Sequence, residues 1–215
     1  MDTTISSECV VDFRPTLYLW LSSLLKREPS PETLAGYRSA EGREMLAQLA
    51  TVPELSESMA GMIALSESWS DPDGTSLDLA VAFARLFLGA DRHAQVPVYE
   101  SVYTSENGRI CQEATSEIAA LLQDHGLNAD GWSEPADHIA VELEFLALLA
   151  DRANTTGDPH AEQGQHALLT RHLFLWGPKF CDLCIERDTS GFYAAAARVL
   201  KSALGREQRR LIRPN

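Results

Sequence analysis

The chain has 215 residues, of which 45% are hydrophobic, so it can bury the core of one large domain or of two small lobes. Its formal net charge of −13 argues against nucleic acid as a partner, because phosphates require clusters of lysine and arginine. No stretch approaches the roughly 20 apolar residues of a membrane-spanning helix. Residues 1–10 carry no feature of a secretory signal or a transit peptide. We therefore expect a cytoplasmic protein without stable membrane insertion.

Apolar residues recur at helical spacing along most of the chain, which predicts an all-α fold of roughly ten helices. The first helix is expected over residues 11–26, with a buried stripe of Leu17, Trp20, Leu21, Leu24 and Leu25. Further helices are expected over residues 32–50, 53–69 and 77–88, the last capped by Ser76 after the turn Asp71-Pro72-Asp73-Gly74.

The second half of the chain shows the same helical spacing. Pro135 suits the first position of a helix, because its missing N–H needs no partner there and its φ is already helical. Gly177-Pro178 should bend the chain. The expected helices cover residues 109–124, 134–153, 159–175, 179–186 and 191–204, the last capped by Ser190.

A stretch rich in glycine and small polar residues, from about residue 125 to 134, separates two strongly helical halves and predicts a hinge. We expect a flexible N-terminus (1–10), an N-terminal lobe (11–125), the hinge (126–134), a C-terminal lobe (135–204) and a basic tail (205–215). A hinge of this kind permits two chains to exchange their C-terminal lobes, so a monomer and a domain-swapped homodimer both remain open.

Charge is unevenly distributed along the chain. The window from Glu100 to Phe145 contains ten acidic residues and a single basic one, Arg109, whereas the stretch from Arg198 onward is basic. An acidic stretch is most simply a solvated helix face. It also attracts a basic partner over long range, so both interpretations remain open at this point.

The four cysteines are too few and too irregularly spaced for a disulfide framework, so we expect reduced thiols. Cys181 and Cys184 lie one helical turn apart among core-like residues, which favours burial over metal binding. An alternative is a metal-dependent or thiol enzyme that uses these two cysteines and His172. The sequence contains no nucleophile elbow, zinc-protease motif or phosphate loop, so we expect no catalytic residue, no metal site and no cofactor.

The most distinctive local string is Glu134-Pro135-Ala136-Asp137-His138. Carboxylates at a helix start are stabilised by the helix dipole, which explains Glu134 and Asp137 as capping residues. A histidine gains nothing there, but His138 is spaced to pair with Glu142 one turn later. The string is therefore either a cap with a surface pair or a binding site.

The string and the apolar helix after it resemble the signature of the TorD/DmsD/NarJ family of redox-enzyme maturation chaperones. The segments Arg85-Leu86-Phe87-Leu88-Gly89, Pro97 to Tyr103 and His172 to Trp176 support this resemblance in the family's order. Within the family the chain looks closest to the TorD branch.

The resemblance implies a helical, non-enzymatic chaperone that binds the twin-arginine leader and the apo form of a molybdoenzyme subunit. It would hold that subunit in the cytoplasm until the molybdenum cofactor is inserted. Glu100 departs from the small residue that some relatives have at this position, which changes the charge of the groove. The residues implied in leader binding are Tyr99, Ser101, Tyr103, Glu134, Pro135, Asp137 and His138, with Phe83, Leu86 and Phe87 supporting an apolar groove.

The residues themselves agree with this implication on one point. A leader that joins two arginines to an apolar stretch needs carboxylates beside aromatic surface, because a guanidinium pairs with carboxylates and stacks on tyrosine. The acidic window contains both kinds of side chain, including Tyr103. An acidic adaptor for a different basic partner remains the alternative.

Overall fold

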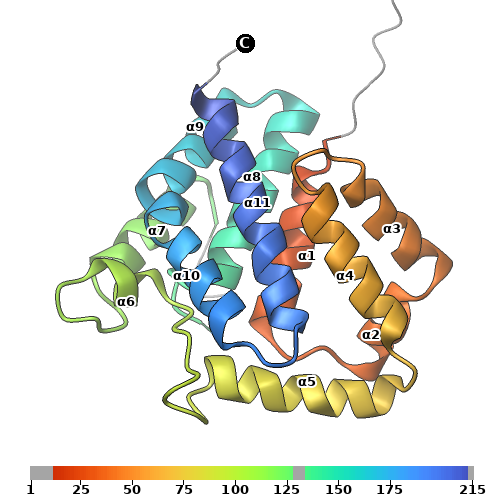
Figure 1. Ribbon diagram of the computed structural model, residues 1–215. Coiled ribbons are helices and arrows are strands. Elements are labelled where there is room, and N and C mark those ends of the chain that lie inside the picture. Colours follow the sequence, from red (N-terminus) through yellow and green to blue (C-terminus); the bar gives the residue numbers. More distant parts are fainter. Residues whose placement is uncertain (1–11, 128–133, 213–215) are drawn as a thin grey trace, which may run out of the picture.

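Helix α1 (Arg14–Lys26) is the central element of the fold, between α8 (Ile139–Thr156) and α11 (Phe192–Ile212) (Figure 1). The computed structural model describes residues 12–127 and 134–212. Within these two ranges the chain forms helices and no β-strand, which confirms the all-α fold. None of the helices described has the length and hydropathy that crossing a bilayer requires.

The other helices surround this central group. They are α2 (Pro31–Tyr37), α3 (Ala40–Ala50), α4 (Ser56–Ser68), α5 (Pro72–Phe87), α6 (Glu100–Thr104), α7 (Glu113–Asp124), α9 (Pro159–Leu168), the π-helical turn η2 (Leu169–Leu173) and α10 (Phe174–Arg187).

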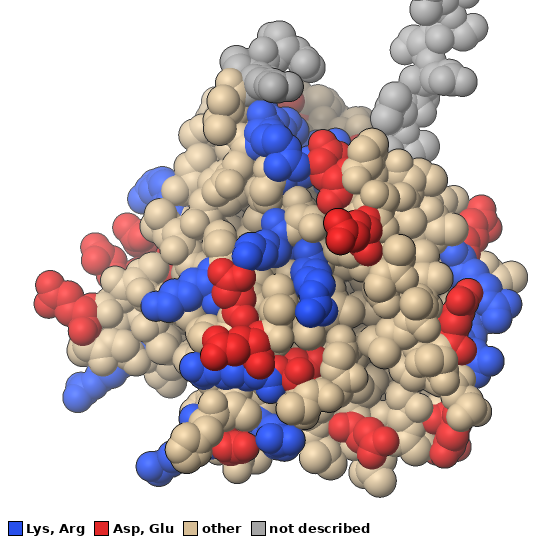
Figure 2. Space-filling model, in the orientation of Figure 1, with Lys and Arg blue, Asp and Glu red and all other residues tan. Residues whose placement is uncertain are grey.

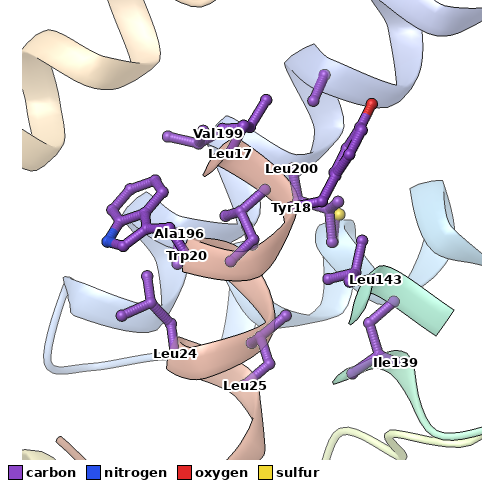
Figure 3. Close-up of a cluster of buried hydrophobic side chains, with 14 of the residues drawn as sticks. Leu17, Tyr18, Trp20, Leu24, Leu25, Ile139, Leu143, Ala196, Val199 and Leu200 are labelled. Atoms are coloured by element: carbon purple, nitrogen blue, oxygen red, sulfur yellow. The ribbon is translucent and has the colours of Figure 1, made fainter. Parts of the chain in front are cut away.

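The buried stripe expected on α1 is confirmed, since all five of its residues belong to the core. Burying a large apolar side chain contributes about 1.5–3 kcal/mol, so this stripe stabilises the packing of α1 on its two neighbours. Tyr18 adds a polar contact, because its hydroxyl donates to Oε1 of the buried Glu207 on α11 at 3.1 Å. Figure 3 shows the cluster, in which Leu17 of α1 lies beside Val199 of α11 and Leu25 lies on the side of α1 that faces Ile139 and Leu143 of α8.

Two details of the N-terminal half differ from the expectation. The segment 32–50 forms two helices, because the hydroxyl of Ser39 accepts a hydrogen bond from Gly42 N at 3.0 Å and starts a new helix. Asp71-Pro72 is a helix start rather than a turn, with Asp71 as the cap and Pro72 in the first turn. Ser76 therefore lies inside α5, and its hydroxyl donates to Pro29 O at 2.8 Å.

The C-terminal half also departs from the expected boundaries. Pro178 does not interrupt the helix but lies inside α10, and the irregular turn is η2, just before that helix. A π-helical turn disrupts the regular α-helical hydrogen-bond pattern upstream of the proline. Ser190 is confirmed as a cap, since its hydroxyl accepts from Phe192 N at 3.2 Å. Helix α11 continues to Ile212, through most of the segment expected as a tail.

One hydrophobic cluster contains residues from both sides of the expected hinge. Helix α1 packs along α8 and α4 packs along α11, so elements of the two expected lobes share a core. Residues 1–11, 128–133 and 213–215, which include the expected flexible N-terminus and most of the hinge, lie outside the described residues. The division into lobes stays a prediction.

Candidate functional site

The turn before α8 lies against the extended segment that leads into α6. An isolated antiparallel bridge joins Tyr99 to His138. On either side of it, Ile139 N donates to Val98 O at 2.8 Å and Glu100 N donates to Asp137 O at 2.9 Å. The structure therefore brings the two motifs singled out in the sequence into direct contact.

Helix α8 begins at Ile139 and not at residue 134, so the expected start was wrong. His138 is the cap, and its Nδ1 accepts a hydrogen bond from Ala140 N at 3.0 Å. Pro135 lies in the preceding turn, where its carbonyl accepts from His138 N at 3.0 Å. Burial lowers the pKa of His138, which keeps the ring neutral and its Nδ1 free to accept. The expected surface pair with Glu142 does not form, because Glu142 is itself buried.

Asp137 is fully buried and ties three segments together. Its Oδ2 accepts from Ser101 N in α6 at 3.0 Å, and its Oδ1 accepts from the hydroxyl of Thr115 in α7 at 2.8 Å. Ser101 extends the connection, since its hydroxyl accepts from Gln112 N at 3.1 Å. Ser101 and Asp137 are 0% exposed and His138 is 5% exposed, so these three residues position the site and do not present a surface to a leader.

Tyr99 and Glu134 remain half-buried and form the accessible part of this turn. The Tyr99 hydroxyl donates to Glu134 Oε2 at 2.8 Å, and its ring lies edge-on to His138 with centroids 5.2 Å apart. Desolvation, and then the Glu134 carboxylate, raises the pKa of Tyr99, so the hydroxyl stays protonated and available as a donor. Pro135 is half-buried beside them.

Tyr103 lies further along α6, and its hydroxyl donates to Pro97 O at 2.7 Å. The Tyr103 ring packs against Trp176, with centroids 5.2 Å apart. The Lys179 ammonium lies over the Tyr103 ring, 5.9 Å from its centroid. The Tyr103 side chain is therefore half-buried, with one part packed in the protein and another part accessible to solvent beside α10.

The three residues expected to support an apolar groove are core residues instead. Phe83, Leu86 and Phe87 are 5%, 2% and 7% exposed. Phe87 packs against Tyr193 of α11 and Phe180 of α10, at centroid distances of 5.3 and 6.3 Å. They are enclosed because α5 packs its apolar face inward, so they support the site only through the core.

A buried acidic cluster includes Glu100 of α6 and Glu142 of α8, and no sequence pattern predicted it. Glu100 Oε2 and His172 Nδ1 are 2.9 Å apart, and both side chains are almost completely buried. Glu142 is also fully buried, and its two oxygens have no hydrogen-bond partner among the described residues. Burial, and then the proximity of Glu100, raises the pKa of Glu142 well above its ordinary value, which favours the neutral form of this carboxyl. The sequence feature that could have indicated this cluster is the presence of Glu142, with Glu144, within the otherwise apolar run 139–150.

An open acidic pocket of about 460 Å³ lies on the outer side of α6, between α7 and η2. Three exposed acids line it, Glu106, Glu113 and Glu117. Arg171 of η2 points into the same pocket and lies 3.7 Å from Glu117. Leu175 is 62% exposed at the rim. Figure 2 shows acidic side chains projecting from the left edge of the molecule, over α6 and the loop that follows it.

Comparison with known proteins decides the family. A family model described as nitrate reductase delta subunit matches residues 40–182. The chain is 37% identical over 191 residues to the chaperone protein TorD of Vibrio cholerae, covering 86% of each chain. It is 35% identical over 196 residues to the chaperone protein TorD of Aliivibrio salmonicida, covering 89% of this chain and 91% of that one. The chain belongs to the TorD/DmsD/NarJ family of redox-enzyme maturation chaperones.

The curated relatives of this TorD-family chain are named chaperones, which supports a maturation chaperone and a non-enzymatic role. A solved structure, described as a candidate redox enzyme maturation protein from Archaeoglobus fulgidus, has the same fold. It superimposes with a TM-score of 0.57 at 21% identity, covering 90% of this chain and 94% of that one.

The cysteine pair of the TorD-family chain is confirmed as part of the core. Cys181 and Cys184 are both 0% exposed, and burial raises the pKa of both thiols. A thiol that stays protonated is neither a good nucleophile nor a ready metal ligand. His172, proposed as their partner in the alternative enzyme, is paired with Glu100 instead.

We expect Asp137→Ala to lower the free energy of unfolding by about 3–5 kcal/mol, because it leaves two buried donors without their charged acceptor. Urea denaturation followed by circular dichroism measures this change. The matched control is Asp151→Ala, because Asp151 is an exposed acid in α8. This substitution should change the free energy of unfolding by less than about 0.5 kcal/mol. An equally mild effect at Asp137 would contradict its positioning role.

We expect Glu142→Gln to stabilise the protein at neutral and alkaline pH. Above the ordinary pKa of 4.5 the unfolded chain releases the Glu142 proton while the folded chain keeps it, so wild-type stability falls as pH rises. Glutamine has no such proton, so the melting temperature of the variant should exceed that of the wild type by a margin that grows with pH. Each kcal/mol corresponds to about 2–4 °C. A margin independent of pH between about pH 5 and pH 8 would refute the buried-proton interpretation.

Proposed function

We propose that this chain binds the twin-arginine leader and the apo form of a molybdoenzyme reductase subunit in the cytoplasm. It thereby assists insertion of the molybdenum cofactor and prevents premature export. The observation that carries the proposal is the acidic pocket beside α6, which already holds one guanidinium, that of Arg171.

The contact of Arg171 with Glu117 is easily replaced. Both side chains are exposed, by 64% and 42%, and an exposed ion pair contributes only about 0–1 kcal/mol. A leader arginine that enters the pocket gains three carboxylates, those of Glu106, Glu113 and Glu117. Arginine suits this arrangement better than lysine, because its planar guanidinium donates to two carboxylate oxygens at once.

The apolar part of a leader also finds partners nearby. Leu175 at the rim is 62% exposed, and Ile110, in the loop between α6 and α7, is 51% exposed. Large apolar side chains exposed beside a charged pocket mark the kind of surface that binds a peptide. The combination matches the chemistry of a leader that carries both arginines and an apolar stretch.

The proposed contact residues change accordingly. Four residues remain candidates because they are half-buried and lie at the start of α6, within it or in the turn that contacts it: Tyr99, Tyr103, Glu134 and Pro135. Ser101, Asp137 and His138 fix the position of α6 and act on the leader only through it. The three pocket acids are added as candidates for binding the arginines.

We expect the combined variant Glu106→Gln, Glu113→Gln and Glu117→Gln to weaken binding of a synthetic twin-arginine leader peptide by about tenfold or more, or 1.4 kcal/mol. Isothermal titration calorimetry measures the affinity. The matched control is Glu44→Gln, Glu57→Gln and Glu67→Gln, which removes the same charge from exposed positions on α3 and α4. Its affinity should stay within about twofold of the wild type, since remote exposed charges are screened.

Equal weakening by the two variants would favour the acidic adaptor, in which overall charge attracts any basic partner. Absence of peptide binding by the wild-type chain would overturn leader recognition altogether.

We also expect the association rate of the leader peptide to fall as salt rises, because the acidic surface then acts over only about 8 Å at physiological ionic strength. Stopped-flow fluorescence at several salt concentrations measures the rate. A peptide with both arginines replaced by glutamine should show little dependence on salt. An association rate of the native leader that does not respond to salt would exclude electrostatic steering.

A further inference from the structure

Two histidines from separate helices meet at the far end of α7 from the acidic pocket. His125 follows the last residue of α7, and His160 lies in the first turn of α9. Their rings stack with centroids 4.0 Å apart and planes inclined by 22°. The Asp124 carboxylate joins them, with its Oδ2 3.5 Å from His160 Nε2. One ligand atom from each of the three residues lies within 4.8 Å of the others.

The position of His125 is fixed by packing. The side chain is 6% exposed and lies edge-on to Phe145 with centroids 5.7 Å apart, while its carbonyl accepts from Arg152 Nη1 at 2.8 Å. Gly164 of α9 makes room for the ring, because a Cβ at this position would collide with the imidazole. A side chain at 164 would therefore close the space that the ring occupies.

The other two groups are more exposed than His125. The side chains of His160 and Asp124 are 48% and 65% exposed. In the structure His160 Nε2 is 3.2 Å from the carbonyl of Asp124, a contact that an ion would replace. The Asp158 carboxylate caps α9 and accepts from His160 N at 2.9 Å, which fixes the backbone of His160.

Two imidazoles and one carboxylate are a ligand set that suits a divalent transition metal. Zn²⁺ binds histidine nitrogen and carboxylate oxygen at about 2.0–2.2 Å, so tetrahedral ligand atoms lie roughly 3.3 Å apart. Because imidazole lone pairs lie in the plane of the ring, the exposed His160 ring would turn out of its stack on His125 to reach this spacing. Three protein ligands leave a fourth position open for water or for a donor from another molecule.

We propose that Asp124, His125 and His160 form a binding site for Zn²⁺. The ion would join the end of α7 to the start of α9, two elements that lie on either side of the expected hinge in the sequence. The site is at the opposite end of α7 from the pocket acid Glu113, so it does not depend on leader binding.

The test is a Zn²⁺ titration of the untagged full chain against a chromogenic chelator, in a Cys111→Ser background because that thiol is exposed and competes for the ion. We expect one equivalent of Zn²⁺ to bind with micromolar or tighter affinity, and His160→Gln and Asp124→Asn each to weaken it at least tenfold. His93→Gln is the matched control, since His93 is exposed and 3.8 Å from Asp91 but has no second imidazole beside it. It should leave affinity unchanged.

Two further readouts separate ligation from folding. Zn²⁺ should raise the melting temperature of the parent chain, and His160→Gln should abolish this rise while leaving the metal-free melting temperature and helical content unchanged. Co²⁺ bound in place of Zn²⁺ should give a spectrum without a thiolate charge-transfer band. Absence of stoichiometric binding, or binding that His160→Gln does not weaken, would overturn the proposal.

Discussion

A single buried carboxylate, that of Asp137, determines how the candidate site is assembled. It accepts hydrogen bonds from the backbone of α6 and from a side chain of α7, while its own carbonyl accepts from Glu100 N. Charge-assisted bonds of this kind, made away from water, are stronger than ordinary ones. The short helix α6 has only five residues and would not be stable alone, so its position follows from these bonds.

The core beneath α6 is unusually polar for the centre of a helical protein. The Glu100–His172 pair is enclosed, and the pKa of the buried Glu142 carboxyl is raised by burial and then by the proximity of Glu100. Burying such groups costs stability that an apolar core would retain. Glu100 belongs to α6 and His172 to η2, two elements that line the acidic pocket, so part of this cost falls at the candidate site.

Much of the fold follows from local sequence. The apolar stripe of α1, centred on Leu21, was predictable because helical periodicity is a property of neighbouring residues. The start of α8 was not predictable from local sequence, because Pro135 also suits the first position of a helix. His138 is the cap because the preceding turn is held against the segment that leads into α6. The position of Pro178 inside α10 was not predictable either, because no sequence pattern predicts the π-helical turn that precedes this helix.

Sequence reasoning selected the two motifs that the structure brings together, but it did not predict which of their side chains are buried. The motifs around Tyr99 and Asp137 are in contact, as their resemblance to one family implied. Which of their side chains face solvent depends on how α6 lies over the turn, and this is a long-range property. The surface pair of His138 with Glu142, one of the two interpretations that the spacing allowed, does not form for the same reason. A spacing of four residues predicts a surface pair only where that side of the helix is exposed, and both residues are buried.

The π-helical turn η2 places two adjacent residues on opposite sides of a boundary. Arg171 lines the open pocket, whereas the next residue, His172, is buried in the core against Glu100. The two residues are joined by one peptide bond. The same short turn therefore supplies both a wall of the outer pocket and a partner of the buried carboxylate of Glu100.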